Sequence, residues 1–405
     1  MQIKPFPALV PASGKAVAVA AVPYDVLNTA EARTLAAGNP DSLLHVSRPE
    51  IDLADTVDIH DDEVYEQGLR AFHDLQQRGV LVREAEPSLY AYRQCMGGRS
   101  QTGIIACSHA DDYENNVIRK HEKTRQDKED DRARHTMTLR ANTGPVFLTY
   151  RDRDEINAAV TQVTSGEPAV DFTAADGVRH TVWRISDDTD KWCAMFADVP
   201  LAYIADGHHR AASGWRAARE CRAANPEHNG SEEYNWFLTV LFPASHLSIM
   251  PYNRVVVDLN GRSEAEFIRV LGEVMEVTEG GDGTPTKPRQ AHMYLGGKWY
   301  TLSWPPFEAG PVERLDVSVL QERVLAPLLA IDDPRTSRSV DFVGGIRGTG
   351  ELVRLVDSGA AAVAFSLYPV TVDDMMDIAD ANQVMPPKST WFEPKLRSGL
   401  AIHTF

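Results

Sequence analysis

The chain has 405 residues and a formal net charge of −17 at pH 7, with 43% hydrophobic and 24% charged residues. A chain of this length can bury a large core in two lobes or domains, and its acidic balance argues against non-specific DNA binding, which needs a basic face. The four cysteines lack any CxxC spacing and no apolar run approaches the roughly 18 residues that span a bilayer, so we expect a cytoplasmic protein without a zinc site, disulfides or a membrane segment.

The first part of the chain is predicted to alternate between short strands and helices. Apolar runs indicate strands at 17–22 and 42–46, and helical periodicity indicates an amphipathic helix at 61–78 that a glycine ends. Alternation on either side of a Gly-Gly turn predicts a hairpin over 88–108. These elements indicate a mixed fold rather than a helical bundle.

The charged stretch 116–140 is unusual because it offers almost no apolar stripe after Ile118 until Met137. It cannot therefore be a core helix, although opposite charges one turn apart, such as Lys123 and Asp127, support an exposed helix. The plain interpretation is a solvated charged face, and the alternative is a functional site.

The stretch 201–224 reads as a buried strand, a turn and a helix, at 201–205, 206–207 and 208–224. This layout points free backbone N–H groups and the positive end of the helix dipole at one spot, where phosphate binds. The first helical turn adds side-chain donors, from His208, His209 and Arg210. Asp206 would repel a bare phosphate, so we expect it to bind Mg²⁺ or to assist proton transfer. The alternative is an ordinary helix start capped by Asp206.

The second half continues with alternating elements. The nearly all-apolar run 236–242 predicts a central strand buried on both faces. Helices are predicted at 263–275, 317–329, 349–358 and 372–381, and a strand at 361–367. Near the end, 385–399 is a proline-rich, locally basic loop, in which Lys388 is followed by Ser389 and Thr390. One charge followed by two hydroxyls suits a phosphate, although it is no P-loop and an ordinary basic turn is the alternative.

Four short boxes carry a resemblance that spans nearly the whole chain. They are Val22-Pro-Tyr-Asp25, the HEKT box (His121–Thr124) with Asp131-Arg132, the DGHHR box (Asp206–Arg210), and the PKST box (Pro387–Thr390) with Pro394-Lys395. Together they resemble a bacterial and archaeal family of unknown function whose members are often labelled SpoOJ/ParB/RepB-related. The DGHHR box is also similar to a motif of the ParB/sulfiredoxin superfamily, and its closest version occurs in kinases that phosphorylate free serine.

The second resemblance implies a chemistry for the HEKT and DGHHR boxes. The DGHHR box would bind phosphates through Gly207, His208, His209 and Arg210. The C-terminal loop has no obvious counterpart in the serine kinases, and its phosphate-binding role is expected from its own basic and hydroxyl residues, Lys388, Ser389, Thr390 and Lys395. Glu122 would be the general base for a substrate hydroxyl, acting with Asp206 and His208, and Asp206 would also be the metal ligand. His121, Lys123 and Thr124 would bind the substrate. Sulfiredoxin has its reactive cysteine where this chain has His208, which argues against redox repair.

These observations lead to one set of expectations. The fold is mixed α/β (α+β), with a ParB/sulfiredoxin-like core around strand 201–205 and helix 208–224, divided into lobes 1–195 and 196–405. The function is a nucleotide-dependent phosphotransferase, a kinase acting on a small hydroxyl metabolite such as free serine, with Mg²⁺ and a nucleoside di- or triphosphate, ATP or ADP. The alternatives are a nucleotide-binding regulatory protein without turnover and a metal-dependent phosphatase or hydrolase. Nucleic acid and membranes are not expected as partners, and a homo-oligomer is compatible with the sequence.

Overall fold

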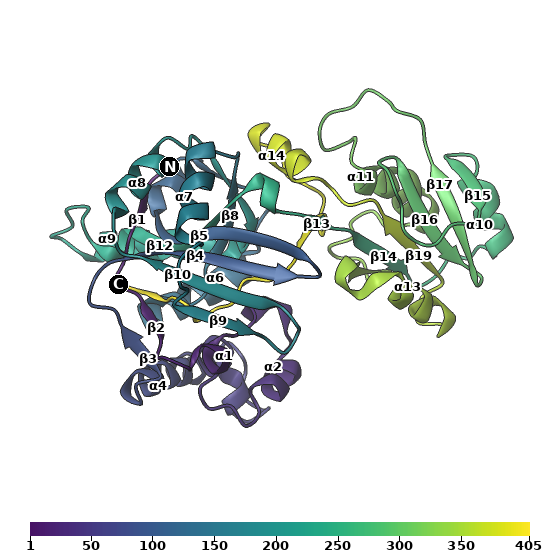
Figure 1. Ribbon diagram of the computed structural model, residues 1–405. Coiled ribbons are helices and arrows are strands. Elements are labelled where there is room, and N and C mark those ends of the chain that lie inside the picture. Colours follow the sequence, from purple (N-terminus) through teal and green to yellow (C-terminus); the bar gives the residue numbers. More distant parts are fainter. The chain divides into compact units, whose positions relative to one another are not determined.

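The computed structural model describes residues 1–405 and divides into two compact units (Figure 1). Unit 1 consists of Met1–Leu247 together with Pro394–Phe405, and unit 2 is Ser248–Glu393. This division differs from the predicted boundary at 195/196. Strands from both sides of that boundary pair in one sheet, as β11 (Ala202–Asp206) does with β8 (Val146–Tyr150), so the chain cannot divide there.

Unit 1 contains a nine-stranded mixed sheet in the order β6-β11-β8-β12-β5-β4-β10-β9, with β1 also paired to β5. Its other strands are β1 (Ile3–Lys4), β4 (Leu89–Met96), β5 (Arg99–His109), β6 (Ile118–Arg119), β9 (Val170–Thr173), β10 (Arg179–Ile185) and β12 (Trp236–Pro243). β6 runs parallel to β11 and β8 parallel to β12, whereas the remaining pairs are antiparallel. The apolar strand β12 lies inside the sheet, as its composition predicts.

Helices and short ribbons surround this sheet. The helices are α1 (Ala16–Val19), α2 (Thr29–Ala36), α3 (Leu44–Ser47), α4 (Asp62–Gln77), α5 (Ala110–Glu114), α6 (Gln126–Leu139), α7 (Asp154–Val163), α8 (Thr189–Ala197) and α9 (His208–Ala224). Two short ribbons pair β2 (Leu9–Pro11) with β3 (Leu81–Arg83), and β7 (Ala141–Asn142) with β21 (His403–Thr404). The predicted strands at 17–22 and 42–46 are wrong: α1 and α3 take up part of these runs, and both contribute to a hydrophobic core that they share with α4.

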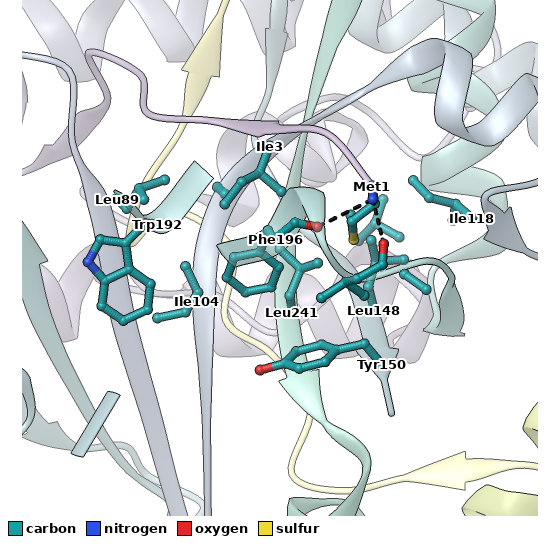
Figure 2. Close-up of a cluster of buried hydrophobic side chains, with 14 of the residues drawn as sticks. Met1, Ile3, Leu89, Ile104, Ile118, Leu148, Tyr150, Trp192, Phe196 and Leu241 are labelled. Atoms are coloured by element: carbon teal, nitrogen blue, oxygen red, sulfur yellow. Dashed lines mark hydrogen bonds between the residues drawn. The ribbon is translucent and has the colours of Figure 1, made fainter. Parts of the chain in front are cut away.

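The main core of unit 1 packs against the sheet and contains apolar side chains from strands and helices far apart in sequence. Figure 2 shows part of it, including Ile104, Leu148, Trp192 and Phe196. Met1 belongs to this core, and its amino group donates hydrogen bonds to the carbonyl oxygens of Phe196 at 3.3 Å and Val199 at 2.6 Å. Burying these side chains provides the main driving force that holds the sheet edge and its loops in place.

Unit 2 has its own six-stranded sheet, in the order β15-β17-β16-β19-β14-β18. The strands are β14 (Tyr252–Val256), β15 (Glu276–Glu279), β16 (Gln290–Leu295), β17 (Lys298–Ser303), β18 (Val340–Gly344) and β19 (Val363–Leu367), and the helices are α10 (Glu264–Leu271), α11 (Asp316–Leu320), α12 (Ala326–Leu329), α13 (Gly348–Asp357) and α14 (Val372–Asp380). The strands that enter and leave this unit, β13 (Ile249–Met250) and β20 (Trp391–Phe392), pair with each other.

The protein is therefore a mixed α/β protein, as predicted from the sequence. The helix 208–224 and the strand before it are present with the predicted bounds to within one residue. None of the helices combines the length and the low polarity that a membrane crossing requires.

Candidate functional site

Two of the predicted boxes leave the sheet at the same edge. β6 and β11 are parallel neighbours, with Ile118 opposite Ala202 and Arg119 opposite Tyr203. The HEKT box follows the end of β6, and the DGHHR box begins at the last residue of β11. Because the carboxyl ends of parallel strands lie at one edge, and ligands of α/β sheets bind there, the topology brings these boxes together.

The turn at Gly207 depends on glycine. Its φ is +90°, a backbone conformation that other residues rarely adopt, and a Cβ atom there would lie 2.9 Å from the guanidinium carbon of Arg210. Immediately before it, the register of β11 on β8 shifts between Ile204 and Asp206, and such bulges redirect side chains. The N-cap residue of α9 is Gly207, which has no side chain to cap the helix, and the first N–H groups of a helix have no acceptor within the helix.

Asp206 lies between two cations. Its Oδ2 accepts a hydrogen bond from Nη2 of Arg210 at 2.9 Å, and its Oδ1 is 3.7 Å from Nζ of Lys395. Burial alone would raise the pKa of Asp206, but Lys395 and Arg210 outweigh it and hold that pKa below its ordinary value. The carboxylate is therefore ionised at neutral pH, and Arg210 is further fixed by a hydrogen bond to the carbonyl of Pro145. Asp25 also acts electrostatically on Arg210.

His208 faces the HEKT box. Its ring is 4.6 Å from that of His121 in an edge-on arrangement, and its Nδ1 is 3.8 Å from Oε2 of Glu122. Burial and then the nearby imidazole of His121 place the pKa of His208 well below its ordinary value, and burial lowers the pKa of His121 to about 4. Both imidazoles are thus neutral at neutral pH, whereas the Glu122 side chain is 51% exposed and accessible to a ligand.

His209 holds the loop of the HEKT box. Its Nε2 accepts a hydrogen bond from the backbone N–H of Arg125 at 3.1 Å, so its remaining donor is Nδ1. In the same loop, the hydroxyl of Thr124 donates to the carboxylate of Glu129, and Lys123 is exposed. The predicted roles of His209 in phosphate binding, and of Thr124 and Lys123 in substrate binding, stay predictions.

The charged stretch is only partly the solvated face that its composition suggested. α6 buries one side, with Ala133, His135 and Leu139, and it packs against α4 and α9. The same helix carries Asp131 and Arg132, which form an ion pair at 2.7 Å, and the guanidinium of Arg132 stacks 4.1 Å above the ring of Tyr24. Tyr24, Asp131 and Arg132 belong to the four boxes described above, but the sequence alone indicates no role for them.

A resident Mg²⁺ fits Asp206 poorly. No group of three His, Cys, Asp or Glu side chains is placed to hold a metal ion. The single carboxylate of Asp206 already faces Arg210 and Lys395, which would compete with a divalent cation for its two oxygens. The role of Asp206 as a metal ligand stays a prediction.

The PKST box lies in unit 2. Lys388 has a φ of +56° and places its Nζ 5.6 Å from the centre of the Tyr252 ring, and the Ser389 hydroxyl donates to the carbonyl of Pro386 at 2.6 Å. The buried guanidinium of Arg254 donates to the carbonyl of Pro387 at 3.3 Å. The contribution of Lys388, Ser389 and Thr390 to phosphate binding stays a prediction, whereas Lys395 belongs to unit 1 and contacts Asp206.

Comparison with known proteins identifies the family. Residues 3–318 match the family described as "Protein of unknown function (DUF1015)". The chain belongs to this family. The matched range includes the HEKT and DGHHR boxes and ends before the PKST box. A comparison with curated protein sequences gives no match.

Solved structures give only distant likenesses to this DUF1015 protein. A free serine kinase in complex with AMP has a TM-score of 0.36 and 13% identity, over 74% of this chain and 92% of that one. A conserved hypothetical protein from Pyrococcus furiosus has a TM-score of 0.36 and 13% identity, over 74% and 94%. SbnI with a C-terminal truncation from Staphylococcus aureus has a TM-score of 0.37 and 10% identity, over 73% and 87%. These values are too low to transfer a fold or an activity.

Proposed function

We propose that this DUF1015 protein is a nucleotide-dependent phosphotransferase acting on a small hydroxyl-bearing metabolite, with free serine as the first acceptor to test. One observation carries the proposal: the parallel strands β6 and β11 deliver an exposed carboxylate, Glu122, and an uncapped helix start, Gly207–Arg210, to one edge of the sheet. Phosphoryl transfer needs mainly positioning and charge neutralisation, which such an arrangement supplies. The match of the DGHHR box to that of free-serine kinases supports the same reaction class.

Each group would have a distinct part in the reaction. The N–H groups of the first turn of α9 would bind phosphoryl oxygens, together with the cations of Arg210 and Lys395, while Asp206 holds both cations in place. Glu122 would take the proton of the acceptor hydroxyl as its oxygen attacks phosphorus and the bond to the departing nucleotide breaks. The neutral imidazole of His208, 3.8 Å from Glu122, would orient that carboxylate.

The decisive variant is Glu122→Gln. It should leave the affinity for ADP and ATP nearly intact, measured by calorimetry, and lower the rate of phosphoryl transfer to serine by roughly 10²–10⁴-fold, the usual worth of a positioned base. Glu155→Gln, at an exposed position of α7, is the matched control and should change neither.

The other candidate functions would give different results. If the wild-type protein binds nucleotide tightly but transfers phosphate neither to a panel of small alcohols nor to water, it is a nucleotide-binding regulator. If phosphate passes to water at the same rate with and without an acceptor, it is a hydrolase. Loss of nucleotide affinity in Glu122→Gln would show that Glu122 anchors the nucleotide and is no base.

A further inference from the structure

A second polar feature also includes Arg210. A cavity of about 40 Å³, here named the Tyr24 cavity, is formed by segments that meet beside α6 and α9. Its lining comprises Pro23, Tyr24, Ser47, Arg132, His135, Thr136, Ala141, Asn142, Thr143, Gly144, Arg210, Ser213 and Ser398. All belong to unit 1, and three of the four boxes contribute residues.

The lining of the Tyr24 cavity is rich in hydrogen-bond donors and contains no acidic side chain. It contains two guanidinium groups, five serine and threonine hydroxyls and the phenol of Tyr24, but no carboxylate, although the protein as a whole is strongly acidic. Burial lowers the pKa of His135 to about 4, so this imidazole is neutral at neutral pH. An acceptor-rich ligand with negative charge fits such a lining, and an ammonium group does not.

Both guanidinium groups keep a donor for such a ligand. Arg132 uses Nε and Nη2 for Asp131, which leaves Nη1. Arg210 uses Nη2 for Asp206 and Nη1 for the carbonyl of Pro145, and its buried Nε has no hydrogen-bond partner. The acids that neutralise these cations, Asp131 and Asp206, do not line the cavity.

Ser47 gives independent evidence for a ligand. It is only 5% exposed, and its hydroxyl has no hydrogen-bond partner in the protein. A buried polar group that lacks a partner costs free energy, and such groups in native proteins commonly meet water, an ion or a substrate. The volume exceeds the roughly 10–15 Å³ that one water needs and suits a group with two or three oxygens.

We propose that the Tyr24 cavity is a subsite for a small oxyanion, a carboxylate or a phosphoryl group, held by Arg132, Arg210 and Ser47. Arg210 links this subsite to Asp206, so the oxyanion belongs to a ligand of the same site. The identity of that ligand rests on the proposed function. The ligand is either a hydroxy acid, whose carboxylate enters the cavity while its hydroxyl contacts Glu122, or the nucleotide, one of whose phosphates enters the cavity. Oxyanion binding itself requires no turnover.

The test is Ser47→Ala. Because the hydroxyl has no partner in the protein, its removal should leave the melting temperature unchanged or slightly higher, while the affinity for the oxyanion falls by about 10-fold. The control is Ser108→Ala, a buried serine outside the cavity whose hydroxyl is 2.8 Å from that of Thr239, which should lower the melting temperature and leave the affinity unchanged.

Binding is measured by calorimetry without nucleotide turnover, using L-glycerate, its neutral counterpart glycerol, and inorganic phosphate. Tight binding of glycerate that Ser47→Ala weakens, with no binding of glycerol, assigns the cavity to an acceptor carboxylate. Weakening of phosphate binding alone assigns it to a phosphoryl group. If Ser47→Ala changes neither affinity, or neither anion binds, the cavity holds only water and the proposal is wrong, whatever the transfer assays show.

Discussion

The carboxylate of Asp206 should be a main source of stability for unit 1, and Asp206→Asn measures it. The substitution keeps the shape of the side chain but leaves Arg210 and Lys395, whose side chains are only 9% and 13% exposed, without their shared anion. Removing one partner of a buried ion pair costs about 3–5 kcal/mol. Since Asp206 is 28% exposed and Arg210 keeps the Pro145 carbonyl, we expect the lower end, about 3 kcal/mol.

The assay is urea and thermal unfolding of the full chain. At roughly 2–4 °C per kcal/mol for a unit of this size, the melting temperature of unit 1 should fall by about 6–12 °C at neutral pH. Asp74→Asn is the matched control, because Asp74 also pairs with an arginine one turn away but is 58% exposed, and it should cost less than about 0.5 kcal/mol.

The difference in the free energy of unfolding between wild type and Asp206→Asn should also depend on pH. A carboxylate with a depressed pKa stabilises the folded state above its unfolded pKa and loses that contribution as the pH falls through its folded pKa. The gap between wild type and Asp206→Asn should thus be constant from neutral pH to about pH 4 and shrink below it. If Asp206→Asn is as stable as wild type at pH 7, the carboxylate is not the counter-ion of these two cations.

Two further predictions concern packing and loop anchoring. Gly214→Ala should destabilise the protein by about 1–3 kcal/mol, because the new Cβ would lie 2.7 Å from the Cβ of Phe237. Gly350→Ala, in α13, should instead stabilise the protein by up to about 1 kcal/mol, because nothing lies within 4 Å of the new Cβ. Urea unfolding measures both free energies, and changes of the same sign would contradict the packing argument. His209→Ala should remove the acceptor for the Arg125 N–H and raise the hydrogen-exchange rate of that amide about 2–10-fold. Mass spectrometry of a peptide covering 120–126 measures this rate. An unchanged rate would mean that His209 does not anchor the loop.

Elements with a strong local pattern could be predicted from the sequence. The amphipathic helix 62–77 and the apolar strand 236–243 have the predicted type because their periodicity or composition determines which face is buried. The short apolar runs at 17–22 and 42–46 could not be assigned in this way, since a few buried residues suit a strand or a helix equally, and the core beside α4 selects the helix.

Only part of the candidate site could be predicted from the sequence. The turn at Gly207 follows from a glycine between an apolar strand and a helical pattern, so it could be predicted locally. The contact between Lys395 and Asp206 and the position of Ser47 in the Tyr24 cavity depend on segments far apart in the chain, and no local pattern indicates them. The division between the units differs from the predicted boundary at 195/196 for the same reason, because β11 and β12 pair with strands from the first half of the chain.

That return has a consequence for how the protein is made. Since β13 and β20 pair, the two crossings between the units lie side by side, and unit 2 is attached like an insert with adjacent ends. On the ribosome, unit 1 stays incomplete until residues 394–405 emerge, when β21 pairs with β7 and Lys395 reaches Asp206. Lys395, one of the two cations beside Asp206, therefore joins the candidate site only after the whole of unit 2 has been synthesised.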